Sequence, residues 1–363
     1  MLEHLEDDYK NKNVLITGHT GFKGSWLSIW LKKLGANVIG YALDPMSLKS
    51  NFVLSEIKDD IVDIRGDIRD SKHLNEVLKT YKPEIVFHLA AQPLVRYSYE
   101  NPRYTYEVNF MGTVNILEAV RATKETKAVV VITSDKCYEN NEWLYSYREI
   151  DQVGGFDPYS ASKGCVELLV SSYRNSFFNP VKYKDHEKII VTTRAGNVIG
   201  GGDWSQDRII PDCIRALEKD EEILLRNPGA VRPWQHVLEP LGGYLVLGSK
   251  LLKKGVEFSG PWNFGPETTN IITVQHVVDK LIKEWGKGVS KSLSTSESSV
   301  HEANLLSLDI SKARLYLNFN PRWNIDETIK KTAEWYKKYK NEKVIDICMS
   351  QIDEYWGLVN QPI

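Results

Sequence analysis

Apolar residues recur with two different periods in the first half of the chain, and the two patterns alternate. Short runs such as 13–17 (NVLIT) and 128–134 (AVVVITS) are apolar almost throughout, which is typical of strands buried on both faces. Trp26, Trp30 and Leu34 follow one such run at the spacing of an amphipathic helix. Apolar runs of this kind predict strands at 13–17, 37–43, 60–68, 84–91, 128–134 and 188–200.

Strands that alternate with helices predict a parallel sheet with helices on both faces, which is a doubly wound α/β fold of the Rossmann type. The alternation stops after Gly200, where 201–237 is rich in Gly, Pro and Trp, and the later segments have helical periodicity without regular strands between them. We therefore expect a Rossmann domain over 1–200 and a smaller, mixed domain, mainly for substrate binding, over 201–363. This division allows elements of the first domain to recur after residue 230.

Composition and charge exclude several classes of function. The net charge of −2 and the lack of any Lys/Arg block argue against a nucleic-acid partner. No apolar run is long enough to span a bilayer, and the first residues lack a signal-peptide pattern, so we expect a cytoplasmic protein without a membrane partner. Cys137, Cys165, Cys213 and Cys348 lie far apart with no C-x-x-C pair, so we expect no metal.

Three glycines mark the turn between the first expected strand and the first helix. Gly18, Gly21 and Gly24 form G-x-x-G-x-x-G, one residue longer in its first interval than the Rossmann fingerprint. Glycines let backbone N–H groups approach a pyrophosphate, and the start of the helix adds positive potential there. An ordinary connecting turn would not explain this spacing, so the segment predicts a dinucleotide site.

Two carboxylates follow the next strands. Asp44 lies twenty residues beyond Gly24, where a carboxylate binds the adenosine ribose hydroxyls and repels a 2′-phosphate, which favours NAD over NADP. The alternative is that Asp44 only forms a turn before Pro45. Asp67 ends the third expected strand, where it would contact the adenine edge or cap the next helix.

A tyrosine and a lysine stand four residues apart at the start of the expected helix 158–177. Tyr159 and Lys163 therefore share one helix face. A phenol acts as a base near neutrality only if its pKa falls well below about 10, and a lysine ammonium one turn away would lower that pKa. Ser134, at the tip of the fifth strand, is a natural third partner for a substrate hydroxyl.

Several longer segments resemble the extended short-chain dehydrogenase/reductase family, and within it the CDP-glucose 4,6-dehydratases. The resemblance covers nearly the whole chain. The segments that carry it are TGHTGFKG (17–24), HLAAQ (88–92), YEVNFMGTVNILEA (106–119), TSDKCYEN (133–140), DPYSASKG (157–164), RAGNVIGGGDWSQDRIIPD (194–212) and RPWQHVLEP (232–240).

The resemblance implies NAD as the cofactor, CDP-glucose as the substrate and a homodimer or homotetramer built on helices near 99–122 and 159–177. It implies substrate contacts from Asn197, Arg208, Arg232 and His301, although each arginine has an alternative as a surface or interdomain residue. The implied cofactor contacts, besides the glycines, Asp44, Asp67, Tyr159 and Lys163, are Thr20, Phe22, Lys23, Ile68, Leu89, Ala90, Ala91 and Asn109.

The strand tip Ser134-Asp135-Lys136 then has a chemical meaning. The resemblance implies that Tyr159 removes the proton of the sugar 4-hydroxyl, that the C5 proton of the 4-ketone is lost while Asp135 protonates the departing 6-hydroxyl, and that hydride returns to C6. Relatives usually carry Glu as the C5 base where this chain has Lys136. Lys136 is therefore a neutral base (hypothesis A), a charge that stabilises the enolate while another group removes the proton (hypothesis B), or a structural partner of Asp135.

Two other readings share most of these features. A nucleotide-sugar 4-epimerase has the same fold, cofactor and tyrosine–lysine pair, but it has no need of an acid and a base for dehydration. A non-catalytic NAD-binding sensor would tolerate loss of Tyr159 or Lys163, and both are present.

Overall fold

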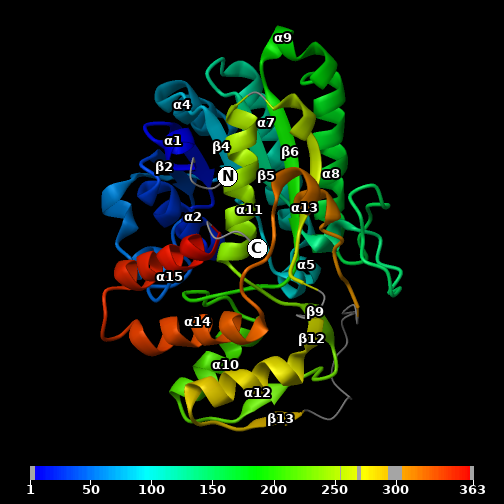
Figure 1. The fold of residues 1–363 in the computed structure, drawn as a ribbon. Helices are drawn as coiled ribbons and strands as arrows, with labels where there is room; N and C mark the ends of the chain where they lie inside the picture. Colours follow the sequence, from blue (N-terminus) through cyan, green and yellow to red (C-terminus); the bar gives the residue numbers. More distant parts are fainter. Residues whose placement is uncertain (1–4, 254, 268–270, 293–304, 360–363) are drawn as a thin grey trace.

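A single sheet of seven parallel strands forms the centre of the molecule (Figure 1). The computed structural model describes residues 5–253, 255–267, 271–292 and 305–359. The strand order runs outward in both directions from β1, as in the doubly wound Rossmann fold, and the expected fold class is confirmed. In spatial order the strands are β11 (Gly260–Phe264), β6 (Ile189–Ala195), β5 (Ala128–Ile132), β4 (Ile85–His88), β1 (Asn13–Thr17), β2 (Asn37–Ala42) and β3 (Val62–Arg65).

Each face of the sheet is covered by its own apolar layer. On one face, α4 (Ser71–Tyr81), α7 (Gly112–Ala122) and α8 (Pro158–Ser176) pack on alternate strand residues. On the other face, α2 (Phe22–Lys33), α11 (Leu238–Leu252) and the helices α1 (Leu5–Tyr9) and α15 (Val344–Val359) pack on the remaining strand residues. Both faces are buried, which explains why the strands are apolar without alternation.

The strand β11 lies among the later segments, for which the sequence pattern predicts helices without regular strands between them. Gly260 has φ 120° and Pro261 lies inside the strand, so the segment GPWNF lacks the apolar, β-branched signal of the other strands. It nevertheless pairs in parallel with β6, with Trp262 opposite Thr193. The second half of the chain thus adds β11 to the edge of the Rossmann sheet and α11 to one of its faces.

A smaller layer lies beyond the carboxyl ends of the strands, below the sheet in Figure 1. It holds α10 (Ile209–Glu218), α12 (Val274–Trp285) and α14 (Ile325–Lys338), with three two-stranded sheets. Within the described ranges, no helix combines the length and the hydropathy needed to cross a membrane. The short strands are β7 (Val198–Ile199) with β10 (Gln235–His236), β8 (Ile223–Leu225) with β13 (Ser290–Ser292), and β9 (Val231–Pro233) with β12 (Ile271–Thr273).

The remaining helices connect these layers. Those near the site are α5 (Val95–Glu100) and α6 (Pro102–Tyr106), followed by a π-helical turn at Glu107–Met111 and, after β5, a 3-10 turn at Asp135–Cys137. The others are α3 (Asn51–Leu54), α9 (Tyr183–His186), α13 (Ser311–Leu317) and the 3-10 turns Ile57–Asp60, Pro180–Lys182 and Val256–Phe258.

A buried carboxyl group joins α11 to the C-terminal segments. Glu239 accepts hydrogen bonds from the backbone N–H groups of Arg322 (2.8 Å) and Trp323 (2.7 Å) and from the hydroxyl of Tyr355 (2.8 Å). Burial raises the pKa of Glu239 to about 7, and these hydrogen bonds only partly oppose the rise. The folded protein therefore holds a proton on Glu239 more tightly than the unfolded chain does.

We expect this group to make stability fall as the pH rises from about 4.5 to above 7. In that range the folded state binds more protons than the unfolded state, so the free energy of unfolding decreases with pH, by up to about 3 kcal/mol in total. Urea unfolding of the wild-type protein and of Glu239→Gln, measured between pH 5 and 8, tests this. The Gln variant should show a smaller loss of stability over this range, and parallel curves for the two proteins would refute the assignment.

Candidate active site

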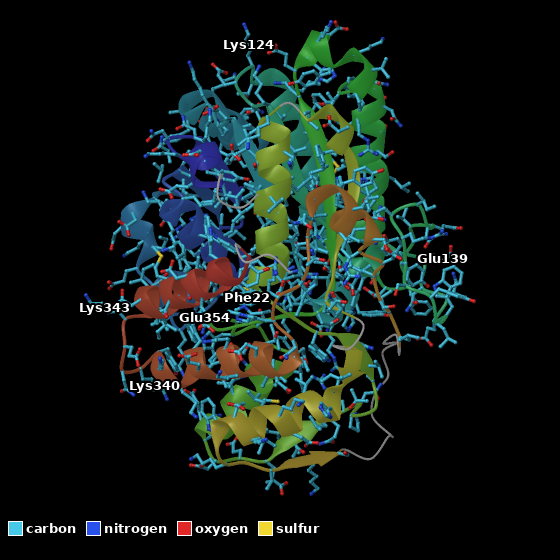
Figure 2. All side chains as sticks on the ribbon, in the orientation of Figure 1. Phe22, Lys124, Glu139, Lys340, Lys343 and Glu354 are labelled. Atoms are coloured by element: carbon cyan, nitrogen blue, oxygen red, sulfur yellow. The ribbon has the colours of Figure 1, made fainter. Side chains whose placement is uncertain are left out.

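A cavity of about 780 Å³ lies at the carboxyl end of the sheet, which is where open α/β sheets bind ligands. Its walls come from the tip of β5, the start of α8, the turn after β6, helix α10 and the segment around β8 and β9. The residues predicted from the sequence that line it are Ser134, Asp135, Lys136, Tyr159, Asn197, Arg208 and Arg232, together with Phe22 and Lys23. In Figure 2, Phe22 is labelled between the sheet and the helices below it.

The tip of β5 is held by local hydrogen bonds. The Ser134 hydroxyl donates to Asp135 Oδ1 (3.0 Å) and accepts the backbone N–H of Lys136 (3.2 Å), so it caps the 3-10 turn that follows. Ser134 and Asp135 are buried, and Lys136 is half-buried. The turn places all three polar side chains in the wall of the cavity.

Asp135 is a carboxyl group that binds its proton more tightly than usual. Burial raises its pKa, while Lys136, the Ser134 hydroxyl and Arg232 act in the opposite direction. The turn after β6 leaves room beside it, because a Cβ on Gly196 would lie 3.1 Å from Asp135 Oδ2. A carboxyl group whose pKa is raised keeps its proton to higher pH than an ordinary aspartate, which suits the role of a general acid.

Helix α8 presents Tyr159 to the same cavity. Asp157 caps the helix through the N–H of Ser160 (2.9 Å), Pro158 occupies its first turn, and the N–H of Tyr159 donates to Ser98 Oγ (3.1 Å). The first turn is therefore fixed before any ligand binds.

The electrostatics of Tyr159 differ from the sequence expectation. Burial raises its pKa to about 12, and the groups that lower it are the Ser134 hydroxyl and Arg208 rather than Lys163. The Lys163 ammonium instead donates to the carbonyl of Ile132 (3.2 Å), and burial lowers its own pKa to about 8. The expectation that Lys163 lowers the Tyr159 pKa is thus not met, because burial dominates and the ammonium is directed to the backbone.

The glycine loop (residues 18–24) lets a ligand come close to its backbone. Gly18 has φ 77°, and a Cβ on Gly24 would lie 2.1 Å from the Gly18 carbonyl oxygen, so both positions require glycine. Gly21 is the N-cap of helix α2, and the first N–H groups of a helix have no partner within the helix, so they can bind an anion. Thr20 is occupied by a hydrogen bond from its hydroxyl to the Leu43 carbonyl (3.0 Å).

Two carboxylates at the neighbouring strand ends have arginine partners. Asp44 is exposed at the end of β2, with Arg65 Nε 3.5 Å away. Asp67 pairs with Arg69 (2.7 Å), which lowers the Asp67 pKa. The cap of α4 is Asp70, so the suggestion that Asp67 caps that helix is wrong.

The other expected cofactor residues lie after β4 or near the start of α7. Leu89, Ala90 and Ala91 follow β4 and are half-buried, and Ile68 packs where a Cβ on Gly112 would lie 2.6 Å away. Asn109 sits in the π-helical turn with its side chain fully engaged: its oxygen accepts the Gln92 N–H (2.7 Å) and its amide donates to Ser162 Oγ (2.8 Å). Asn109 therefore holds α8 in place from inside the structure.

The substrate side of the cavity is rich in arginine. Arg208 donates to the buried Asp203 (2.8 Å), and Arg232 lies close enough to Asp135 to lower its pKa. Asn197 lies in the turn between β6 and β7. His301 lies outside the described residues.

A second set of charged residues, not predicted from the sequence, lines this cavity. Arg96, Arg226 and Asp207 line it, with Asp207 3.8 Å from Arg96 and 2.9 Å from Arg226. Arg96 follows the HLAAQ segment and Arg226 follows β8. These two arginines are more than a hundred residues apart in the sequence. No local pattern marks them as neighbours.

Comparisons with known proteins identify the family of this chain. The family model described as GDP-mannose 4,6 dehydratase matches residues 15–332. A CDP-glucose 4,6-dehydratase of Salmonella typhimurium is 50% identical over 96% of this chain and 97% of the relative. A CDP-paratose 2-epimerase of Salmonella typhi is 30% identical over 89% of this chain and 98% of the relative.

Solved structures agree. The structure of MoeE5 in complex with UDP-glucose and NAD has a TM-score of 0.75 and 25% identity, and the match covers 91% of this chain and 100% of that one. The chain belongs to the GDP-mannose 4,6 dehydratase family, and the resemblance inferred from its motifs is confirmed.

Proposed function

We propose that this protein catalyses the NAD-dependent dehydration of CDP-D-glucose to CDP-4-dehydro-6-deoxy-D-glucose. The observation that carries the proposal is that Asp135 and Lys136, needed for loss of water, line the same cavity as Ser134 and Tyr159, needed for oxidation. The dehydratase of Salmonella typhimurium, similar along nearly its whole length, supports CDP-glucose as the substrate.

The glycine loop fits NAD. The close approach at Gly18 and Gly24 leaves no room for side chains, and the start of α2 follows directly, as pyrophosphate binding requires. Asp44 and Lys163 would hold the adenosine and nicotinamide riboses. When bound, NAD supplies the acceptor for the hydride from C4 and later the donor of a hydride to C6.

The chain's own residues perform the proton transfers. Tyr159 removes the proton of the sugar 4-hydroxyl. Ser134 orients the phenol oxygen of Tyr159 and the oxygen of that sugar hydroxyl. The resulting 4-ketone makes the C5 proton acidic, and the neutral amine of Lys136 accepts that proton. Asp135, whose buried carboxyl group favours the protonated form, donates to the departing 6-hydroxyl. Arg208 and Arg232 hold the substrate diphosphate, for which a planar guanidinium is suited, and Asn197 supports the sugar.

The product distinguishes this reaction from its rivals. Incubation with CDP-, TDP-, GDP- and UDP-linked glucose, followed by mass spectrometry, should show loss of one water from the CDP sugar with the highest kcat/KM. The similarity to a CDP-paratose 2-epimerase makes epimerisation the second candidate. An epimerised product of unchanged mass would favour that candidate, and no turnover of any sugar would contradict both.

Cofactor choice gives a further expected result. Because Arg65 lies 3.5 Å from Asp44, removing the carboxylate with Asp44→Ser leaves a guanidinium beside the expected 2′-position. We expect the ratio of NADP to NAD affinity to rise about tenfold or more, since each 1.4 kcal/mol corresponds to a factor of ten. Fluorescence titration with both nucleotides measures the ratio, and an unchanged ratio would argue against Asp44 as the ribose contact.

The proposal includes a homodimer or homotetramer in the cytoplasm. Helices α6 and α8 pack on one another, and large apolar side chains beside them stay exposed, including Leu168 (61%), Met111 (47%) and Phe177 (45%). A second copy would cover this face. Light scattering of the purified protein tests the assembly.

A further inference from the structure

A buried ion pair lies directly behind the tip of β5. Arg194 of β6 and Glu167 of α8 are joined at 2.8 Å, and their side chains are only 3% and 4% exposed. Two buried threonines donate to the same carboxylate: Thr133 to Oε1 (2.5 Å) and Thr192 to Oε2 (2.7 Å). Both carboxylate oxygens of Glu167 thus accept hydrogen bonds from buried side chains.

This ion pair contacts the residues on both sides of segment 134–137, which we call the catalytic turn. Thr133, which binds Glu167, immediately precedes Ser134. Tyr138 immediately follows the 3-10 turn, and its hydroxyl accepts from Arg194 Nη1 (2.6 Å) and donates to Asn263 of β11 (2.8 Å). Residues 134–137 are therefore held between two buried side-chain contacts that lead to one ion pair.

The same carboxylate belongs to the helix that carries the proton relay. Glu167 follows Lys163 by four residues and Tyr159 by eight, so the three share one face of α8. Glu167 therefore connects the helix bearing Tyr159 to the strand tip bearing Ser134, Asp135 and Lys136. A buried ion pair is weak evidence for stability, because apolar residues of similar size often serve as well, and its better attested use is to specify one arrangement.

We propose that Glu167 is a positioning residue for the dehydration: through Thr133 it sets the position of Ser134 relative to Tyr159. The inference rests on the proposed function and adds a role outside the cavity. A shift of about 1 Å between reacting groups is enough to cost roughly a hundredfold in rate.

The position of Ser134 also affects how readily Tyr159 ionises. The Ser134 hydrogen bond is the largest contribution that lowers the Tyr159 pKa, and the charged groups facing Tyr159 are Asp135, Asp157 and Arg208. A displaced Ser134 should leave Tyr159 harder to ionise. The rise of kcat/KM with pH should then move to higher pH, which a purely structural role for the network would not cause.

The two threonines provide a matched test. Thr133→Val removes the hydroxyl that joins Glu167 to the catalytic turn and leaves the Arg194–Glu167 pair intact. Thr192→Val removes an equally buried hydroxyl bound to the same carboxylate, from the middle of β6. Thr133→Ser restores the hydroxyl. The measurements are kcat, KM and the pH profile of 4-keto product formation from CDP-glucose, with melting temperatures for each variant.

We expect Thr133→Val to lower kcat by about tenfold to a hundredfold with little change in KM, and to shift the pH profile upward. Thr192→Val should lose similar stability but keep the wild-type kcat and profile, and Thr133→Ser should recover most of the rate. Equal effects of the two Val variants would overturn the inference. If Thr133→Val does not fold, Thr133→Ala against Thr192→Ala makes the same comparison. Failure of the wild-type protein to form the 4-keto product would instead refute the proposed function.

Discussion

Tyr159→Phe is expected to lower kcat for the dehydration by roughly 10²–10⁴, the range typical of a positioned proton transfer. The variant keeps the ring and its packing but lacks the hydroxyl that we propose takes the proton of the sugar 4-hydroxyl. Because oxidation at C4 precedes the loss of water, no 4-keto intermediate should accumulate. Absorbance of reduced cofactor in a single turnover measures the first step, and mass spectrometry of the product measures the whole reaction.

Tyr9→Phe is the matched control. Tyr9 is also fully buried, and its hydroxyl donates to the Leu245 carbonyl (2.8 Å) in the layer of α1 and α11. This variant should lose some stability but retain the wild-type rate. A Tyr159→Phe protein that keeps more than about a tenth of the wild-type rate would contradict the assignment of the base.

The pH dependence follows from the same residue. Burial raises the Tyr159 pKa to about 12, and as the proposed base Tyr159 reacts in its phenolate form. The rate should therefore rise with pH across the neutral and mildly alkaline range, where the ionised fraction grows. In Tyr159→Phe this limb of the kcat/KM profile should be absent.

Replacing Lys136 should give the second large effect and decide its role. We expect hypothesis A, in which neutral Lys136 removes the C5 proton, because the turn places Lys136 and the proposed acid Asp135 in the wall of the same cavity, where both reach one sugar. Lys136→Met should then lower kcat by roughly 10²–10⁴ and stop deuterium incorporation at C5 in D₂O. Proton NMR of the recovered sugar measures the incorporation.

Lys136→Arg separates basicity from charge. Arginine keeps the positive charge but stays protonated, so it cannot accept the C5 proton. Under hypothesis A, both variants lose the exchange. Under hypothesis B, in which the charge stabilises the enolate, Lys136→Arg retains substantial exchange and turnover. Normal exchange in Lys136→Met would exclude hypothesis A.

The placement of Lys136 beside Asp135 also bears on the structural alternative. The Lys136 charge is the largest of the contributions that lower the Asp135 pKa. If the pairing is only structural, Lys136→Met should chiefly destabilise the turn and leave the exchange at C5 intact. A combined measurement of melting temperature and exchange therefore distinguishes all three roles.

Features with a local signal along the chain could be predicted from the sequence. The parallel sheet follows from apolar runs alternating with helical periodicity. The tight glycine loop, which we propose binds the cofactor, follows from three glycines between a strand and a helix. Tyr159 and Lys163 share a helix face because four residues make about one turn. The gathering of Ser134, Asp135 and Lys136 at the same cavity follows because they end a strand at the carboxyl edge of the sheet.

Other features needed the tertiary structure. Strand β11 lacks a strand-like sequence and is defined by its pairing with β6. Asp67 pairs with Arg69, and the Lys163 ammonium donates to the Ile132 carbonyl. Both contacts depend on side-chain geometry, which the spacing of residues along the chain does not specify.

The electrostatics of the site were decided in the same way. The pKa of Tyr159 and the contact between Glu167 and Arg194 result from burial and from partners on different elements. A pattern along the chain places a residue on a strand or a helix face. How far a group is removed from water, and which charges surround it, is fixed only when distant segments pack together, because both depend on contacts in three dimensions.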